Sequence, residues 1–405
     1  MNESPDFPAT RQSALARLAA FLEHATGGHG YAATRNYVLP GHPNVSRLAP
    51  AIRHRLISEE EVVRLALARH EFSKIEKFIQ EVLWRSYWKG WLELRPDVWS
   101  SYIEQVCQPS HHFDADTIAR ASHVASGQSP SPIMNAFARE LLLTGYLHNH
   151  ARMWWAGFWV HHCKLPWQLG AHHFFCHLLD ADPASNTLSW RWVAGLQTPG
   201  KSYLTTPANI EKFCDPSLLS AAGGIGLETQ TKPARQPDEH KSLPIQENIK
   251  YPTSPQNLLR PFAILVHDED LSVENSPVGS VSNPSCLLHF EPDLSAEPVP
   301  RQRWLREARD DARQRAKAHF KIPATICKTP EDILKKTREA GCQFLVAIAP
   351  FVGPLRTSLN IENTNSPGFI WLRRRWDAKV IPLCSRGFFP FWFQAKKQLH
   401  QLIAS

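Results

Sequence analysis

Several signatures that assign proteins to a class are missing from this sequence. Its eight cysteines include no CxxC pair, which argues against a zinc site, an iron–sulfur site and a disulfide framework, so we expect reduced thiols and no metal. No apolar run spans a membrane: Phe344–Val352 has about half of the roughly 20 residues required. The N-terminal MNESPDFPAT carries no basic and apolar signal segment. We therefore expect a cytoplasmic protein with no membrane partner.

Histidine and charge are unevenly distributed along the chain. Fifteen of the 20 histidines lie in residues 1–220, including three adjacent pairs, but no third ligand at helical spacing accompanies these pairs. The net charge is +7, of which residues 221–405 supply +6. A modest basic excess permits nucleic-acid binding without establishing it.

The composition divides the chain into two folded parts. A length of 405 residues with 43% hydrophobic content suffices for two cores. Up to about residue 219, apolar residues recur at spacings of three and four, which predicts helices, one of them starting at Ser58. A polar, proline-rich stretch follows and is typical of a linker that need not pack. We predict an all-α domain at 1–220, a linker at 221–260 and an α/β domain at 261–405.

The second half alternates short apolar runs with amphipathic segments. The runs predict buried strands at Phe262–His267, Cys286–Phe290, Ala324–Cys327, Phe344–Ala349 and Val380–Cys384. The amphipathic segments predict helices around residues 302–320, 330–340 and 390–403. This order predicts a mainly parallel sheet with helices on both faces. No GxGxxG follows the first strand, so a dinucleotide fingerprint is missing.

One stretch of the helical half, LLDADPASNTLSWRW at residues 178–192, combines carboxylates, an amide and large aromatics. This mixture is typical of a surface turn or of a site that orders a flat ligand. Flavin adenine dinucleotide (FAD) would need anion donors, carboxylates for its hydroxyls and a fixed polar atom beside N5. Taken singly, the candidates have ordinary alternatives: Glu81 and Arg85 are spaced as a helical ion pair, and the two aspartates suit a turn.

Five ordered segments of this half resemble the flavin-binding domain of the photolyase/cryptochrome family. NVSRLAP (44–50) is similar to the family's phosphate-binding turn TSRLSP, and IQEVLWRSYW (79–88) is similar to NELIWREF. GYLHNHARM, LPWQLGAHHFF and LLDADPASNTLSWRWVAG resemble W-M-H-N-R-x-R-M, W-R-x-G-x-x-x-F and D-G-D-x-A-x-N-x-x-x-W-x-W. The resemblance implies an all-α FAD-binding domain of photolyase type.

The resemblance also implies roles on the cofactor side. Residues at the family's FAD-contacting positions are Tyr31, Ser46, Arg47, Leu48, Arg85, Asn149, Arg152, Asp180, Asp182 and Asn186. Arg152 would pair with Asp180 beside the isoalloxazine ring. Asn186 would lie next to flavin N5, where dimer-repair enzymes of this family typically have asparagine.

On the substrate side, the resemblance implies a pocket for a flipped pyrimidine dimer in DNA or single-stranded nucleic acid. Its lining positions are Glu81, Trp84, Asn149, His150, Met153 and Trp192. The implied reaction is light-driven electron transfer from fully reduced FAD to a cyclobutane dimer. Glu81 and Asn186 would take part in that chemistry, and Trp190 and Trp167 would supply electrons.

Departures from the family pattern leave other functions open. The position of a third, surface tryptophan falls near His123-Val124, so photoreduction would either be slower or use another aromatic, such as Trp154 or Trp155. His150 stands where the family commonly has arginine, and Val45 where it has threonine. A cryptochrome-type photoreceptor or redox sensor, or a nucleic-acid-binding flavoprotein without repair activity, is therefore the alternative to a deoxyribodipyrimidine photolyase-like lyase.

The second half raises two further alternatives. FAILVHDEDLSVENSP (262–277) is similar to the opening strand and R-x-D-L-R-x-x-D-N-P motif of the family's antenna domain, which normally precedes the helical domain. The α/β half is thus either a relocated antenna-type domain or an independent Rossmann-like module. Residues 371–379 and 385–397 have the composition of a single-strand binding surface. Alternatively, their aromatics dock on the helical half and their arginines stay solvated.

Overall fold

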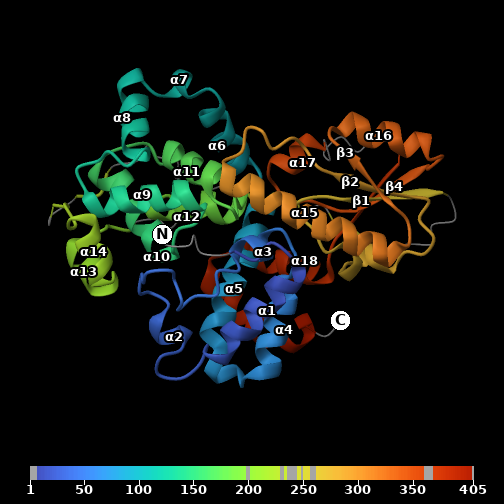
Figure 1. Ribbon diagram of the computed structural model, residues 1–405, viewed down its shortest axis with the longest axis horizontal. Helices are drawn as coiled ribbons and strands as arrows, with labels where there is room; N and C mark the ends of the chain where they lie inside the picture. The colour runs from blue at the N-terminus through green and yellow to red at the C-terminus, as the bar shows by residue number, and fades with distance from the viewer. Residues whose placement is uncertain are drawn as a thin grey trace.

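The computed structural model describes residues 7–197, 201–228, 232–234, 244–247, 250–255, 261–359 and 368–403. Its first half is helical, and its second half is built around a five-stranded parallel sheet (Figure 1). This architecture confirms the fold class predicted from the sequence. Among the described residues, no helix combines the length and the apolar character needed to cross a membrane.

In the described residues, the helical half contains fourteen α-helices and one π-helical turn. They are α1 (Arg11–Glu23), α2 (Tyr31–Thr34), α3 (Ala49–Arg53), α4 (Glu59–Arg69), α5 (Phe72–Glu93), α6 (Asp97–Cys107), α7 (Pro109–His112), α8 (Ala115–Ala125), α9 (Pro132–Thr144), α10 (Asn149–Gly157), η1 (Phe158–His162), α11 (Trp167–His177), α12 (Pro183–Val193), α13 (Pro207–Phe213) and α14 (Pro216–Ala222).

Local signals explain where α4 and α12 begin. The Ser58 side chain accepts a hydrogen bond from the backbone N–H of Glu61, which caps α4 at the predicted start. Asp182 caps α12 in the same way, and Pro183 occupies the first turn, where its missing N–H costs nothing. α5 contacts α2, α4 and α12, so it holds the centre of this half (Figure 1).

The α/β half has a sheet with strand order β3-β2-β1-β4-β5. Its elements are β1 (Phe262–Val266), η2 (Val273–Asn275), η3 (Pro277–Ser280), β2 (Cys286–Phe290), α15 (Val299–Phe320), β3 (Ala324–Cys327), α16 (Pro330–Glu339), β4 (Phe344–Ile348), α17 (Pro354–Ser358), β5 (Phe369–Leu372), α18 (Arg375–Val380), η4 (Ile381–Ser385), α19 (Phe388–Lys397) and α20 (Leu399–Ile403).

Alternate residues of the central strands serve two different cores. Ile264 of β1, in register with Val346 of β4, joins the core that contains α15 and continues into the helical half. Leu265, in register with Ala347, packs with Ile333 of α16 in a smaller core on the other face. Every residue of β1 is buried, as expected for a parallel strand covered on both faces. One hydrophobic core therefore links the two halves.

The prediction of a strand at Val380–Cys384 is wrong. These residues finish α18 and form the 3-10 turn η4, while the fifth strand is Phe369–Leu372. A short apolar run fits a buried helical segment as well as a strand, and η4 buries Ile381 and Cys384 against the helical half rather than in the sheet. β5 was missed because it is an edge strand that is only partly buried.

The chain after β5 leaves the sheet and docks on the helical half. In Figure 1 the red C-terminal helices lie beside α4 and α5, and α19 and α20 contact those two helices. The indole N–H of Trp376 donates to the Ser86 hydroxyl over 3.0 Å. Docking of the aromatics was the alternative foreseen for this segment, but its arginines are not all solvated, because Arg373 and Arg374 are 3% and 7% exposed.

Parts of the predicted linker pack against the folded halves, which corrects the expectation that it need not pack. The backbone N–H of Gln246 donates to the carbonyl of Leu94 over 2.9 Å. Further along, the carbonyl of Pro252 accepts from the N–H of Arg373, also over 2.9 Å. The described pieces of residues 221–260 therefore run along the protein surface.

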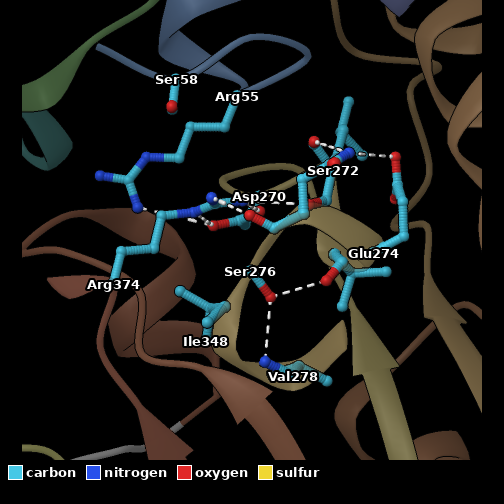
Figure 2. A network of polar contacts seen from close by, with 12 residues as sticks. Arg55, Ser58, Asp270, Ser272, Glu274, Ser276, Val278, Ile348 and Arg374 are labelled. Carbon is cyan, nitrogen blue, oxygen red and sulfur yellow. Dashed lines mark hydrogen bonds and ion pairs between the residues drawn. The ribbon is translucent and has the colours of Figure 1, made fainter. Parts of the chain in front are cut away.

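A buried ionic network joins the two halves. Arg55, which follows α3, donates to both carboxylate oxygens of Asp377 over 2.7 and 2.8 Å. Its guanidinium also lies 3.5 Å from the Asp270 carboxylate. Arg374 donates two hydrogen bonds, of 2.6 and 2.7 Å, to the same carboxylate. Figure 2 shows Arg55 and Arg374 converging on Asp270. Moving one half relative to the other would leave some of these buried charges without a partner, which is costly.

Candidate functional site

A carboxylate at the start of α12 and a guanidinium on α5 form the centre of the candidate site. Asp182 Oδ1 accepts the backbone N–H groups of Ala184 and Ser185, each over 3.0 Å. Its second oxygen accepts from Arg85 Nη1 over 2.5 Å. Asp182 therefore caps its own helix and ties α12 to α5 with opposite oxygens. The ordinary helical pair of Glu81 with Arg85 is absent from the described contacts, because Arg85 turns to Asp182 instead.

The Asp182 carboxyl stays ionised for a definable reason. Burial alone would raise its pKa, but Arg85, then Arg53 and Lys89, outweigh burial and lower the pKa below its ordinary value. Arg53 and Lys89 were not foreseen as members of the site. Lys89 lies four residues after Arg85 on α5, so helical spacing was a usable signal for it.

A second ion pair lies next to the first. Arg152 of α10 donates to Asp180 over 3.2 Å and, through Nε, to the carbonyl of Leu147 over 2.8 Å. This confirms the predicted pairing of Arg152 with Asp180. Between the two aspartates, Ala181 has a φ of 30°, in the left-handed region where the family signature has glycine.

Asn186 lies one turn into α12 and is held in a fixed orientation. Its side-chain N–H donates to the carbonyl of Ala171 in α11 over 2.8 Å, and the residue is 8% exposed. Because the amide nitrogen is engaged, the side chain cannot rotate freely. The carbonyl oxygen Oδ1 makes no hydrogen bond with the described residues, so an acceptor of fixed direction is available here.

Glu81 and Trp84 lie on the partly exposed face of α5. Glu81 forms an ion pair with Lys77 over 2.9 Å and lies 3.8 Å from Arg35, a residue that the sequence did not single out. One face of the Trp84 indole is covered by Phe388 of α19, with ring centroids 3.5 Å apart and planes within 6°. The other predicted tryptophan, Trp192, packs on Tyr203 with centroids 5.7 Å apart.

Three predicted substrate residues lie on α10, but one of them turns inward. The Asn149 amide lies 3.9 Å from the Met153 sulfur, one helical turn away, and both residues are accessible. His150 is 9% exposed, and its Nδ1 lies 2.7 Å from the carbonyl of Asn36. Burial lowers the pKa of His150, so it is a neutral, internally bonded residue, unlike the arginine common at this position in the family.

The predicted electron-supply residues are buried among aromatics. Trp190 lies 6.2 Å from Trp155 and 6.4 Å from Trp159, measured between ring centroids. Trp167 stacks instead on Tyr102, with centroids 5.6 Å apart. Among the described ring contacts none joins Trp190 to Trp167, and Trp155, which lies beside Trp190, is one of the substitutes foreseen for the missing surface tryptophan.

The predicted phosphate-binding segment has mixed exposure. Tyr31 begins α2, and burial and then the Glu81 charge raise its pKa. Arg47 has a φ of 55°, and Ser46 beside it is partly exposed. Leu48 is 1% exposed and precedes α3, so it contributes packing. Within the described residues, no three His, Cys, Asp or Glu side chains come together as a metal site would require.

Comparison with known proteins finds that part of the helical half matches a family model. Residues 78–218 match the family model described as the FAD binding domain of DNA photolyase. The cofactor expected from the sequence, FAD, is therefore confirmed at the level of the family. The matched range contains Glu81 and all of the later motif residues up to Trp192.

Individual relatives cover only part of the chain. A deoxyribodipyrimidine photo-lyase of Streptomyces griseus is 35% identical over 157 residues, which is 38% of this chain and 32% of the relative. Cryptochrome DASH of Idiomarina loihiensis is 29% identical over 215 residues, 52% of this chain and 46% of the relative. A class III photolyase structure from Agrobacterium tumefaciens is 25% identical, covers 59% of this chain and 53% of that chain, and has a TM-score of 0.43.

Proposed function

Because residues 78–218 match the FAD binding domain of DNA photolyase, we propose that this protein uses FAD to repair cyclobutane pyrimidine dimers in DNA under blue light. The observation that carries the proposal is that residues of α5 face in two directions. Glu81 and Trp84 share its partly exposed face, while Arg85 turns toward Asp182. One helix thus offers a surface for a base and a contact for the cofactor.

The residues present fit FAD. Arg85 and Arg152 are cations suited to an anionic cofactor, Asp180 and Asp182 accept from hydroxyl and N–H groups, and Asn186 holds an acceptor in a fixed direction. When bound and fully reduced, FAD supplies upon excitation the electron that opens the cyclobutane ring and is then returned. The buried ion pairs fix these side chains in advance, so little reorganisation accompanies binding.

On the substrate side, each residue has a definable task. The Glu81 carboxylate accepts a hydrogen bond from a pyrimidine N–H, with Lys77 and Arg35 keeping it in place. Trp84 and Trp192 pack against the apolar faces of the dimer. The Asn149 amide can both donate and accept, which suits the alternating groups on a pyrimidine edge. A dimer pairs poorly within a duplex, so its extrusion costs less than that of a normal base.

A cryptochrome-type photoreceptor or redox sensor is the second candidate. It is favoured by Phe388, which covers one face of Trp84 and leaves less of the indole for a base. A nucleic-acid-binding flavoprotein without repair activity is the corresponding third outcome. The three differ in whether dimers are lost, whether nucleic acid binds and whether light matters.

The test is to incubate the reduced protein with dimer-containing oligothymidine, single- and double-stranded, under blue light and in darkness. Loss of dimers in the light alone is the expected result. Binding without loss would favour the third candidate, and neither binding nor loss would favour the photoreceptor.

Two variants assign the site within the same assay. Trp192→Ala should weaken dimer binding by about tenfold, because stacking contributes roughly 1–3 kcal/mol per base. Asn186→Ala should lower the repair rate while the flavin absorbance of the purified protein is retained. Leu143→Ala, which changes an exposed apolar side chain on α9, is the control and should repair at the normal rate. Normal repair by both site variants would refute the assignment.

A further inference from the structure

Helix α19 presents an unusual outer face. Phe388, Phe391 and Trp392 are buried against the helical half, but Phe389 and Phe393 are 63% and 62% exposed. These two are the only phenylalanines among the exposed large hydrophobic residues of the described chain. Spaced four apart, they lie on one side of the helix. We call Phe389 and Phe393, with Arg386 and Lys397, the α19 aromatic face.

This face is continuous with the proposed substrate pocket. Trp84 stacks on Phe388 at 3.5 Å, and Phe388 meets the edge of Phe389 at 5.8 Å between ring centroids. The rings of Trp84, Phe388 and Phe389 therefore form a row of contacts from α5 to the exposed side of α19. Lys396 lies 2.6 Å from Glu76, so the far end of α19 is also attached to α5. The packing of Phe388 on Trp84 at one end of the helix, with this exposed ion pair at the other, thus places the exposed rings beside α5.

Cations flank the two phenylalanines along the chain, and Glu76 of α5, a carboxylate beside α19, is paired with Lys396. No aspartate or glutamate follows Asp377 in the sequence, whereas Arg386 and Lys397 are exposed cations that flank the two phenylalanines. Exposed aromatic rings interleaved with cations bind single-stranded nucleic acid, since every base offers a face for stacking and every phosphate a negative charge. An acidic or apolar peptide would match only one of these two features.

We propose that the α19 aromatic face binds the nucleic-acid strand beside the lesion, in single-stranded form, as that strand leaves the pocket at Trp84. Bases stack on Phe389 and Phe393, while Arg386 and Lys397 neutralise the phosphates. The inference rests on the proposed function, because it assumes a dimer at Trp84. It assigns to the α/β half a part in substrate binding that the helical half alone does not supply.

The test varies the length of the substrate. Binding of a dimer-containing oligothymidine of about four nucleotides and one of about 16 is measured by fluorescence anisotropy for the wild type and for the double variant Phe389→Ala/Phe393→Ala. We expect the double variant to lose about tenfold or more in affinity for the long strand and to bind the short one normally. The variant Phe389→Trp/Phe393→Trp should keep the affinity for the long strand.

For Arg386→Gln/Lys397→Gln, the slope of log affinity against log salt should fall by about 1.4, or roughly 0.7 for each lost phosphate contact.

Leu143→Ala and Val299→Ala, which remove exposed apolar side chains elsewhere, are matched controls and should bind both strands normally. Equal affinity of the wild type and the Phe389→Ala/Phe393→Ala variant for the long strand would overturn the proposal. An equal loss for short and long strands would also overturn it, because the face would then act through the shape of the pocket. Failure of the proposed function gives a different result: the wild type would not bind the short dimer or repair it in light.

Discussion

Ala181 has a backbone conformation that is unfavourable for a residue with a side chain. Ala181, between the two site aspartates, is 3% exposed and has a φ of 30°, which costs an L-residue with a Cβ roughly 1–2 kcal/mol. The matching position of the family signature is glycine. On either side of it, Asp180 and Asp182 accept hydrogen bonds from guanidinium groups of two different helices.

Ala181→Gly should therefore raise the free energy of unfolding by about 1 kcal/mol, as measured by urea denaturation. Glycine is favoured here although it gains more freedom in the unfolded chain, since the left-handed region removes the Cβ clash. Ala19→Gly, at an exposed position inside α1, is the control and should destabilise by about 1 kcal/mol. Equal destabilisation by both substitutions would show that Ala181 is not strained.

Residue-level prediction from the sequence succeeded where a motif fixed neighbours and failed where the partner was distant. Arg152 and Asp180 could be paired because both belong to recognisable segments. The stacking of Phe388 on Trp84 could not be predicted, because more than 300 residues separate the two and neither segment has a sequence pattern that indicates the contact. The roles of the site residues toward FAD and dimer stay predictions.

At the level of elements, helix periodicity was a better guide than short apolar runs. α15 and α16 were predicted within a few residues, since each carries a long amphipathic pattern. The run Val380–Cys384 was assigned to the sheet, yet η4 packs against α5. A run of five apolar residues is too short to show the periodicity of either a strand or a helix. Its secondary structure therefore depends on what it packs against.

The close approach of α5 and η4 makes Gly90 a sensitive position. A Cβ at residue 90 would lie 2.5 Å from the Cys384 sulfur and 3.2 Å from the Ile381 Cα. Gly90→Ala should lower the free energy of unfolding by about 1–3 kcal/mol, because the two elements would have to separate. Gly28→Ala, with open space around it, should change stability by less than about 0.5 kcal/mol.

Combining Gly90→Ala with Cys384→Ala separates the steric effect from a loss of helix contacts. Removing the sulfur opens the space that the new methyl group needs, so the double variant should be more stable than the sum of the two single changes predicts. Strict additivity in urea denaturation would mean that the clash with Cys384 is not the cause.

At the scale of the whole molecule, the two halves act as one folding unit. One hydrophobic core extends from α1 to α20, and buried charges connect the halves at several points. The sequence indicated two compositions but not this interface, because no local pattern pairs Arg55 with Asp377 across 322 positions. Its position beside Arg53, which also acts on Asp182, places the interface next to the candidate cofactor site.

Arg55→Ala should consequently destabilise the entire chain. The substitution leaves the Asp377 carboxylate, 5% exposed, without its guanidinium, and breaking a buried pair in this way costs about 3–5 kcal/mol. Arg69→Ala is the control, since its pair with Glu23 is about half exposed and should contribute less than about 1 kcal/mol. Urea denaturation followed by tryptophan fluorescence measures both.

The double variant Arg55→Met/Asp377→Leu should regain much of the loss, because apolar side chains of similar volume leave no unpaired charge. If it stayed as unstable as Arg55→Ala, the loss would come from packing around Arg55 rather than from the stranded carboxylate.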